Sequence, residues 1–102
     1  MRVAVIGDYG KPEYKELLER VRIAFSEEYI IDMSRHQQSD WKDRLELRIL
    51  DMDSAHLVIV CSKWDNCVDV KRDITEAQKI NRDLVIEHEG RFIPFTQYTA
   101  RQ

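Results

Sequence analysis

The segment Ser62–Ala77 reads SKWDNCVDVKRDITEA and carries three regularly spaced carboxylates, Asp65, Asp69 and Asp73. The spacing of its apolar residues predicts a helix over about residues 69–81. On a helical wheel Asp73 falls between Ala77 and Ile80, on the side of the helix that carries the core residues. We therefore expect one carboxylate of this segment to point inward.

An inward carboxylate near the start of a helix has two interpretations. In the first, Asp73 accepts hydrogen bonds from a loop at the end of the sheet, or reaches solvent, and also suits the positive end of the helix dipole. In the second, Asp73 faces a ligand crevice, where it could act as a nucleophile or bind sugar hydroxyls. The preceding apolar strand favours the second interpretation, because ligands of such folds bind beyond the strand ends.

Alternating strands and helices position this carboxylate. The run His56–Cys61, HLVIVC, is continuously apolar, which is typical of a central parallel strand buried on both faces. Shorter strands are expected at residues 2–6, 29–33 and 84–86, and helices at about residues 12–27 and 40–53. Residues 91–95 could add a short edge strand, since Pro94 forbids a central one. The last residues have the composition of a tail.

The order of these elements predicts an α/β fold in a single domain over residues 1–102. We expect a flavodoxin-like three-layer sandwich, with a parallel sheet of four to five strands in the order 2-1-3-4 and helices on both faces. The ligand crevice of such a sheet lies between strands 1 and 3. Two loops would border it, Gly7–Lys11 and Ser62–Asp69.

These loops supply the candidate substrate-binding residues: Gly7, Asp8, Tyr9, Trp64, Asp65, Asn66, Cys67 and Asp69. Tyr9 is a candidate ligand contact or an exposed turn residue. Asp8 and Asp65 could accept hydrogen bonds from sugar hydroxyls or serve as ordinary turn residues. Trp64 could stack on a base or pack over the end of the sheet.

The helix expected at residues 40–53 is apolar on two sides. One stripe contains Trp41, Leu45, Ile49 and Met52, and Leu47 and Leu50 lie on the other side. Such a helix is usually covered twice. We expect the sheet to cover one side and either a second subunit or the C-terminal tail to cover the other, with a homodimer through helix 40–53 favoured.

Composition excludes several classes of function. The net charge is −3, and the basic residues alternate with acidic ones, which argues against a nucleic-acid partner. No apolar run is long enough to cross a membrane, so a cytoplasmic protein without a membrane partner is expected. Neither the cysteines nor the histidines have metal-ligand spacing, and the sequence GDYG lacks the dinucleotide fingerprint. We expect no metal and no cofactor.

The run from Trp41 to Ile86 resembles the nucleoside 2-deoxyribosyltransferase-like family, especially its small bacterial and phage members. The family pattern is an apolar strand, then W-x-x-S-x-G-x-x-x-E-x-x-x-A, then a short step to the next strand. Here HLVIVC is followed by WDNCVDVKRDITEA, Trp64–Ala77, in the same register. The GDY sequence after the first strand is also similar to the family's substrate-facing loop.

The resemblance implies cleavage of the N-glycosidic bond of deoxynucleosides or their monophosphates, by a deoxyribosyltransferase or a nucleotide N-hydrolase. In the family a glutamate on this helix attacks the anomeric carbon and forms a covalent sugar ester, following retaining-glycosidase logic. The matching position is Asp73, the candidate catalytic residue. A neighbouring subunit often completes the site in this family.

This chain departs from the family pattern at several positions. The glutamate is the shorter Asp73, the motif serine is Cys67, and the motif glycine is Asp69, whose charge would repel a phosphate. In the family an aspartate is common just before the apolar part of the third strand, and this chain has His56 at that position. These departures predict an altered substrate, weak catalysis or none. The alternative functions are a non-catalytic nucleotide-binding module, or a TIR-like signalling domain acting on NAD, against which the short chain and the motif register count.

Overall fold

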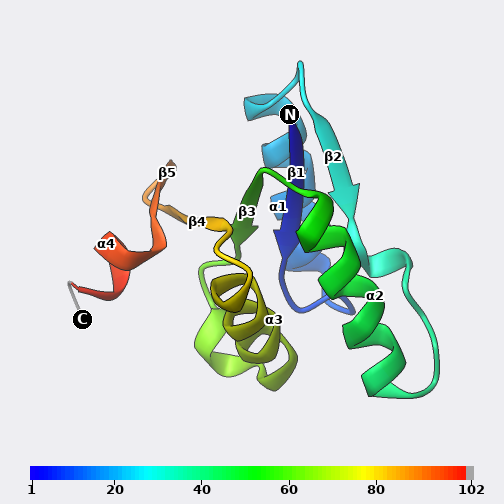
Figure 1. Ribbon diagram of the computed structural model, residues 1–102. Helices are drawn as coiled ribbons and strands as arrows, with labels where there is room; N and C mark the ends of the chain where they lie inside the picture. The colour runs from blue at the N-terminus through cyan, green and yellow to red at the C-terminus, as the bar shows by residue number, and fades with distance from the viewer. Residues whose placement is uncertain (101–102) are drawn as a thin grey trace.

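The computed structural model describes residues 1–100, which form a five-stranded sheet in the order β2-β1-β3-β4-β5 (Figure 1). Strands β1 to β4 are parallel to one another. The predicted α/β class and the order 2-1-3-4 are therefore confirmed. The strands are β1 (Arg2–Ile6), β2 (Tyr29–Asp32), β3 (Leu57–Val60), β4 (Asp83–His88) and β5 (Arg91–Pro94).

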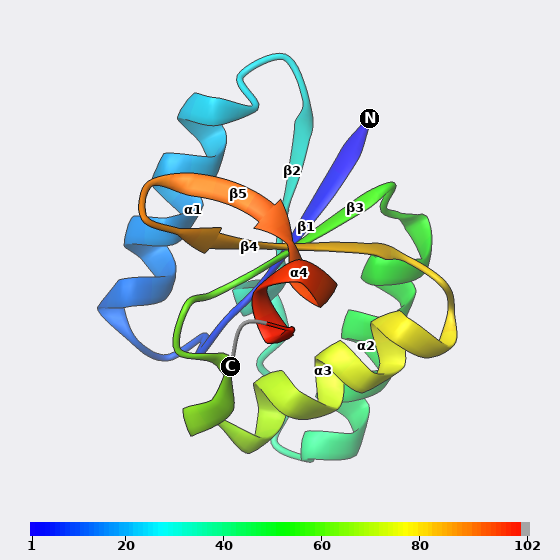
Figure 2. The same ribbon diagram turned by 90° about the vertical axis from the view of Figure 1, so that its left-hand side faces the viewer.

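The helices cover both faces of this sheet. Helix α1 packs on one face, and α2 and α3 pack side by side on the other, as Figure 2 shows. Both β1 and β3 are buried on both faces because each contributes apolar side chains to both clusters. The helices are α1 (Pro12–Ala24), α2 (Trp41–Ser54), α3 (Val68–Lys79) and α4 (Phe95–Thr99), with single 3₁₀ turns at Met33–Arg35 and Trp64–Asn66.

The prediction of a purely parallel sheet was wrong for the fifth strand. Strand β5 runs antiparallel to β4, with Pro94 opposite Val85 at the sheet edge. The turn between the strands explains this, because Glu89 and Gly90 both have positive φ angles, 51° and 76°. Two such residues form the tight turn that joins antiparallel strands.

The expectation of a C-terminal tail was also wrong. Residues Phe95–Thr99 form the short helix α4, and the Phe95 side chain is buried on the same face of the sheet as α2 and α3. The Trp64 ring meets the Phe95 ring edge-on, with 5.3 Å between the ring centroids. Helix α4 therefore contributes Phe95 to the core. No helix within residues 1–100 is both long and apolar enough to span a bilayer.

Gly7, at the end of β1, is required by its neighbour Tyr14. The Tyr14 side chain is buried, and its hydroxyl donates a hydrogen bond to the carbonyl oxygen of Val5 at 2.9 Å. A Cβ atom on Gly7 would lie 2.7 Å from Cδ2 of Tyr14, which is too close for real atoms. The chain therefore passes from β1 into the loop Gly7–Lys11 through a residue that has no side chain.

We expect Gly7→Ala to lower the free energy of unfolding by about 1–3 kcal/mol, because the Tyr14 ring cannot give way without losing its hydrogen bond. Urea denaturation followed by circular dichroism measures the change. The matched control is Gly10→Ala, since no atom lies within 4 Å of a Cβ there. Equal effects of the two substitutions would contradict this account of Gly7.

Candidate functional site

The carboxylate of Asp73 forms a buried ion pair with Arg48. Nε of Arg48 donates to both carboxylate oxygens, with distances of 3.1 Å to Oδ1 and 2.9 Å to Oδ2. The side chains are 0% exposed for Asp73 and 3% exposed for Arg48. Asp73 comes from α3 and Arg48 from α2, so the pair connects the two helices on one face of the sheet. The predicted inward orientation of Asp73 is confirmed.

Tyr9, which is half-buried, is the third member of this cluster. Its hydroxyl donates a hydrogen bond to Oδ2 of Asp73 at 2.7 Å. The guanidinium carbon of Arg48 lies 5.1 Å from the centroid of the Tyr9 ring, within the range of a cation–π contact. Tyr9 also contacts Tyr14. The two rings meet edge-on, with 5.0 Å between the ring centroids. The loop after β1 thus connects the ion pair to α1.

Burial and charge act in opposite directions on these groups. Removal from water raises the pKa of Asp73 above its ordinary value, although the charge of Arg48 and the Tyr9 hydrogen bond both lower it. Burial, together with the charge of Asp73, holds the pKa of Tyr9 well above its ordinary value. Tyr9 is therefore a hydrogen-bond donor to Asp73.

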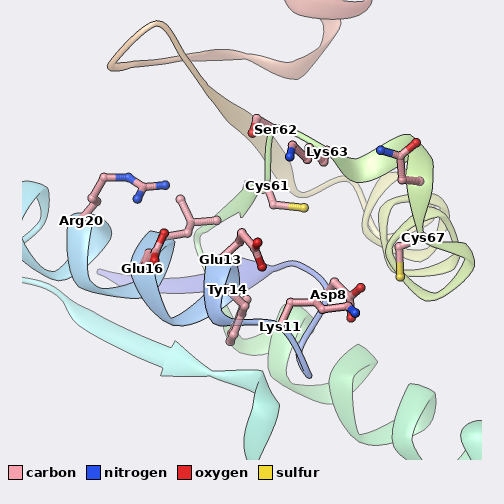
Figure 3. A pocket seen from close by; sticks show the side chains of 12 residues that line it. Asp8, Lys11, Glu13, Tyr14, Glu16, Arg20, Cys61, Ser62, Lys63 and Cys67 are labelled. Carbon is pink, nitrogen blue, oxygen red and sulfur yellow. The ribbon is translucent and has the colours of Figure 1, made fainter.

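A separate cavity of about 370 Å³ lies between α1 and the segment Cys61–Cys67 (Figure 3). It opens at the carboxyl ends of the neighbouring strands β1 and β3, where the sequence predicted a crevice. Burial raises the pKa of the Cys61 thiol, which is half-buried at this cavity. The charged lining residues are Asp8, Glu13 and Glu16 with Lys11, Arg20 and Lys63, and the neutral polar ones include Ser62 and Asn66.

The predicted site residues divide between these two places. Asp8, Asn66 and Cys67 line the cavity. Tyr9 and Asp73 meet in the buried cluster, and neither lines the cavity.

The remaining predicted residues lie outside both places or support the fold. Of the two interpretations of Trp64, base stacking and packing, the structure shows packing, against Phe95 of α4. Asp65 is exposed beside it. Asp69 accepts from Nη1 of Arg72 at 3.4 Å, and Gly7 accommodates Tyr14. The eight binding candidates therefore do not form one site.

Sequence reasoning missed Arg48, which is the direct partner of Asp73. A signal was present, because Arg48 shares the inward stripe of α2 with Leu45 and Met52. A cation on a core-facing position of one helix and a carboxylate on that of the next indicate a buried pair. The cavity residues Glu13 and Glu16 were missed as well, since they lie on the polar side of an amphipathic helix and resemble an ordinary solvated surface.

Comparisons of this chain with protein-family models, with curated proteins and with solved structures give no match. The resemblance drawn from the motif around Asp73 therefore stays a prediction.

The ion pair makes a prediction about stability. Arg48→Met leaves Asp73 buried without its cation, and we expect a loss of about 3–5 kcal/mol in the free energy of unfolding at neutral pH. The double variant Arg48→Met/Asp73→Leu removes both charges and should be markedly more stable than Arg48→Met. Urea denaturation of both single variants and the double variant gives the coupling between the residues. Additive losses would contradict a direct pair.

The loss of Arg48 also predicts a dependence of stability on pH. In Arg48→Met the folded-state pKa of Asp73 rises further above its unfolded value, because the cation that opposes desolvation is lost and only the Tyr9 hydrogen bond still lowers this pKa. The folded state then binds the extra proton, so stability falls as the pH rises between the unfolded and folded pKa values. Arg48→Met/Asp73→Asn should lack this fall, and the difference between the two variants from acidic to neutral pH isolates the contribution of Asp73. Parallel curves would show that Asp73 does not titrate in this range.

Proposed function

We propose that the chain is a binding module for a small polar ligand of the nucleoside or nucleotide class, which occupies the cavity between α1 and the segment Cys61–Cys67. The observation that carries the proposal is a cavity at the carboxyl ends of β1 and β3 lined by uncommitted charges. Among residues 1–100, Asp8, Glu13, Glu16, Lys11 and Lys63 take part in no ion pair.

The chemistry of the lining supports this class of ligand. Ionised carboxylates accept hydrogen bonds only, so Asp8, Glu13 and Glu16 suit the hydroxyl groups of a sugar. The Asn66 amide can donate to and accept from a base, and the two lysines suit a phosphate or a carbonyl oxygen. The cavity volume of about 370 Å³ lies in the range of small-molecule sites. We also propose a flavodoxin-like three-layer sandwich as the architecture, in which this position is the topological switch point.

Burial of Asp73 favours binding over catalysis. Attack on a sugar carbon requires a carboxylate oxygen to approach that carbon, and Asp73 is 0% exposed with both oxygens engaged by Arg48. The Tyr9 hydroxyl also donates a hydrogen bond to Oδ2 of Asp73. A ligand in the cavity would therefore leave the ion pair untouched.

A second candidate function is cleavage of an N-glycosidic bond, as a deoxyribosyltransferase or a nucleotide N-hydrolase. The hydrogen bond from Tyr9 to Asp73 favours it, because Tyr9 belongs to the same loop as the cavity residue Asp8. Displacement of this loop would give a substrate access to the carboxylate. Asp73 would then attack the anomeric carbon, the base would leave with the bonding electrons and take up a proton, and water or a second base would release the sugar.

The binding proposal predicts saturable binding of a deoxynucleoside or its monophosphate, measured by isothermal titration calorimetry. Lys63→Gln and Asp8→Asn should each weaken binding about tenfold or more, because each removes a charge from the cavity lining. The matched controls are Lys15→Gln and Asp83→Asn, whose exposed side chains lie outside it. Folded protein that binds no member of the panel at millimolar concentration would contradict the proposal.

Catalysis is tested separately by the release of free base from the same panel, with NAD added as the substrate expected of a TIR-like domain. Under the binding proposal no base is released, and ligand binding survives Asp73→Asn, which keeps the shape of the side chain. Release that disappears in Asp73→Asn, while calorimetric binding persists, would replace the binding module by the second candidate. Cleavage of NAD alone would instead indicate the TIR-like alternative.

A further inference from the structure

Two glutamates of α1 line the proposed ligand cavity without a partner inside the protein. Glu13 and Glu16 lie in the first two turns of α1, and Asp8 of the loop after β1 lines the same cavity (Figure 3). None of these three carboxylates forms an ion pair within residues 1–100. Their charges therefore act directly on whatever enters the cavity.

The cationic side chains of the cavity do not fully balance these carboxylates. Arg20 is bound by Glu87 in a bidentate pair, with Nε 2.7 Å from Oε2 and Nη2 2.7 Å from Oε1. The charge of Arg20 is thereby offset by a carboxylate that does not itself line the cavity. Among the described residues that line it, Lys11 and Lys63 are the cations outside any ion pair, against three such carboxylates. The unpaired charges of the lining are therefore negative in sum.

The start of α1 lacks the set of backbone N–H groups with which a helix commonly binds a phosphate. The N–H group of Lys11 donates to the carbonyl oxygen of Asp8 at 3.0 Å, and Pro12 has no N–H group. The N–H group of Tyr14 donates to the carbonyl oxygen of Lys11 at 3.1 Å. Glu13, the remaining residue of this turn, carries a carboxylate that would repel a phosphate.

Backbone N–H groups of the loop after β3 are also engaged within the protein. The N–H group of Asn66 donates to the carbonyl oxygen of Lys63 at 3.3 Å. Burial raises the pKa of the Cys61 thiol, and hydrogen bonds from the backbone N–H groups of Lys63 and Asp8 oppose this rise. These two N–H groups therefore face the sulfur of Cys61. Donors that could hold a phosphate are thus already bound on both loops at the cavity.

We propose that Glu13 and Glu16 determine the specificity of the cavity by repelling phosphorylated ligands, so that it takes an uncharged ligand rich in hydroxyl groups, such as an unphosphorylated nucleoside. The inference rests on the proposed function and narrows it. An ionised carboxylate accepts hydrogen bonds from hydroxyl groups, whereas a phosphate monoester brings up to two negative charges toward it. Lys11 and Lys63 would then donate to the carbonyl oxygens of a base.

Isothermal titration calorimetry with the common deoxynucleosides and their 5′-monophosphates tests the inference. We expect the wild-type protein to bind a nucleoside about tenfold or more tightly than its monophosphate at low salt, because each carboxylate repels the phosphate. Glu13→Gln and Glu16→Gln keep the shape of the side chain and remove its charge. Each should strengthen monophosphate binding and weaken nucleoside binding, and the double variant should abolish the preference. A loss of folding would weaken the binding of both compounds, so it cannot produce these opposite changes.

Glu19→Gln is the matched control, because Glu19 lies on the same helix and is exposed but does not line the cavity. It should leave the preference unchanged. Added salt should reduce the preference of the wild type, since Glu13 and Glu16 are exposed and salt screens exposed charges. A monophosphate that binds as tightly as its nucleoside, or a preference that persists in the double variant, would overturn this inference and leave the proposed function standing. Folded wild-type protein that binds neither compound would overturn both.

Discussion

The ion pair between Arg48 and Asp73 constrains the position of the two helices that cover one face of the sheet. Two charges buried this completely are costly to remove from water, and their attraction compensates for this only while the geometry is kept. Sliding α2 along α3 would separate Nε of Arg48 from the carboxylate, whereas apolar contacts alone would tolerate small shifts. The pair therefore favours one register of α2 on α3.

Tyr9 extends this constraint to the end of the sheet. Its hydroxyl is fixed by Asp73, its ring lies near the Arg48 guanidinium, and its edge meets Tyr14 of α1. The loop after β1 is thus held between the two helical layers at the place where the sheet ends. The cavity beside α1 owes its inner wall to this arrangement, because Tyr14 lines it and Asp8 precedes Tyr9.

The spacing of apolar residues is a property of a single helix or strand. It was therefore enough to predict the central strands and the helices around them. Continuous apolar runs identified β1 and β3, and the wheel of α3 identified Asp73 as inward. Contacts between elements were harder to predict. Arg48 lay on the core-facing stripe of α2, but nothing in a single sequence states which carboxylate it meets 25 positions later.

The pairing of strands at the edge of the sheet was also hard to predict from the sequence. Strand β5 is antiparallel because Glu89 and Gly90 form a tight turn, and a glutamate at positive φ is not an ordinary turn signal. The site itself was predicted as one crevice from two loops. It separates into a buried cluster and an open cavity because Tyr9 turns inward to a carboxylate and Asp8, its neighbour in sequence, turns outward.

The buried cluster also links helix α2 to the loop that borders the cavity. Arg48 lies on α2 and Tyr9 lies on the loop that borders the cavity, so the carboxylate of Asp73 is in contact with both elements. A shift of α2 would act on Asp73 first and on Tyr9 through it. Such coupling requires that the ion pair have two discrete arrangements, since a chain of contacts does not by itself transmit free energy. The structure shows one such arrangement, with both oxygens of Asp73 engaged by Arg48, so a ligand in the cavity is expected to leave the ion pair as it is.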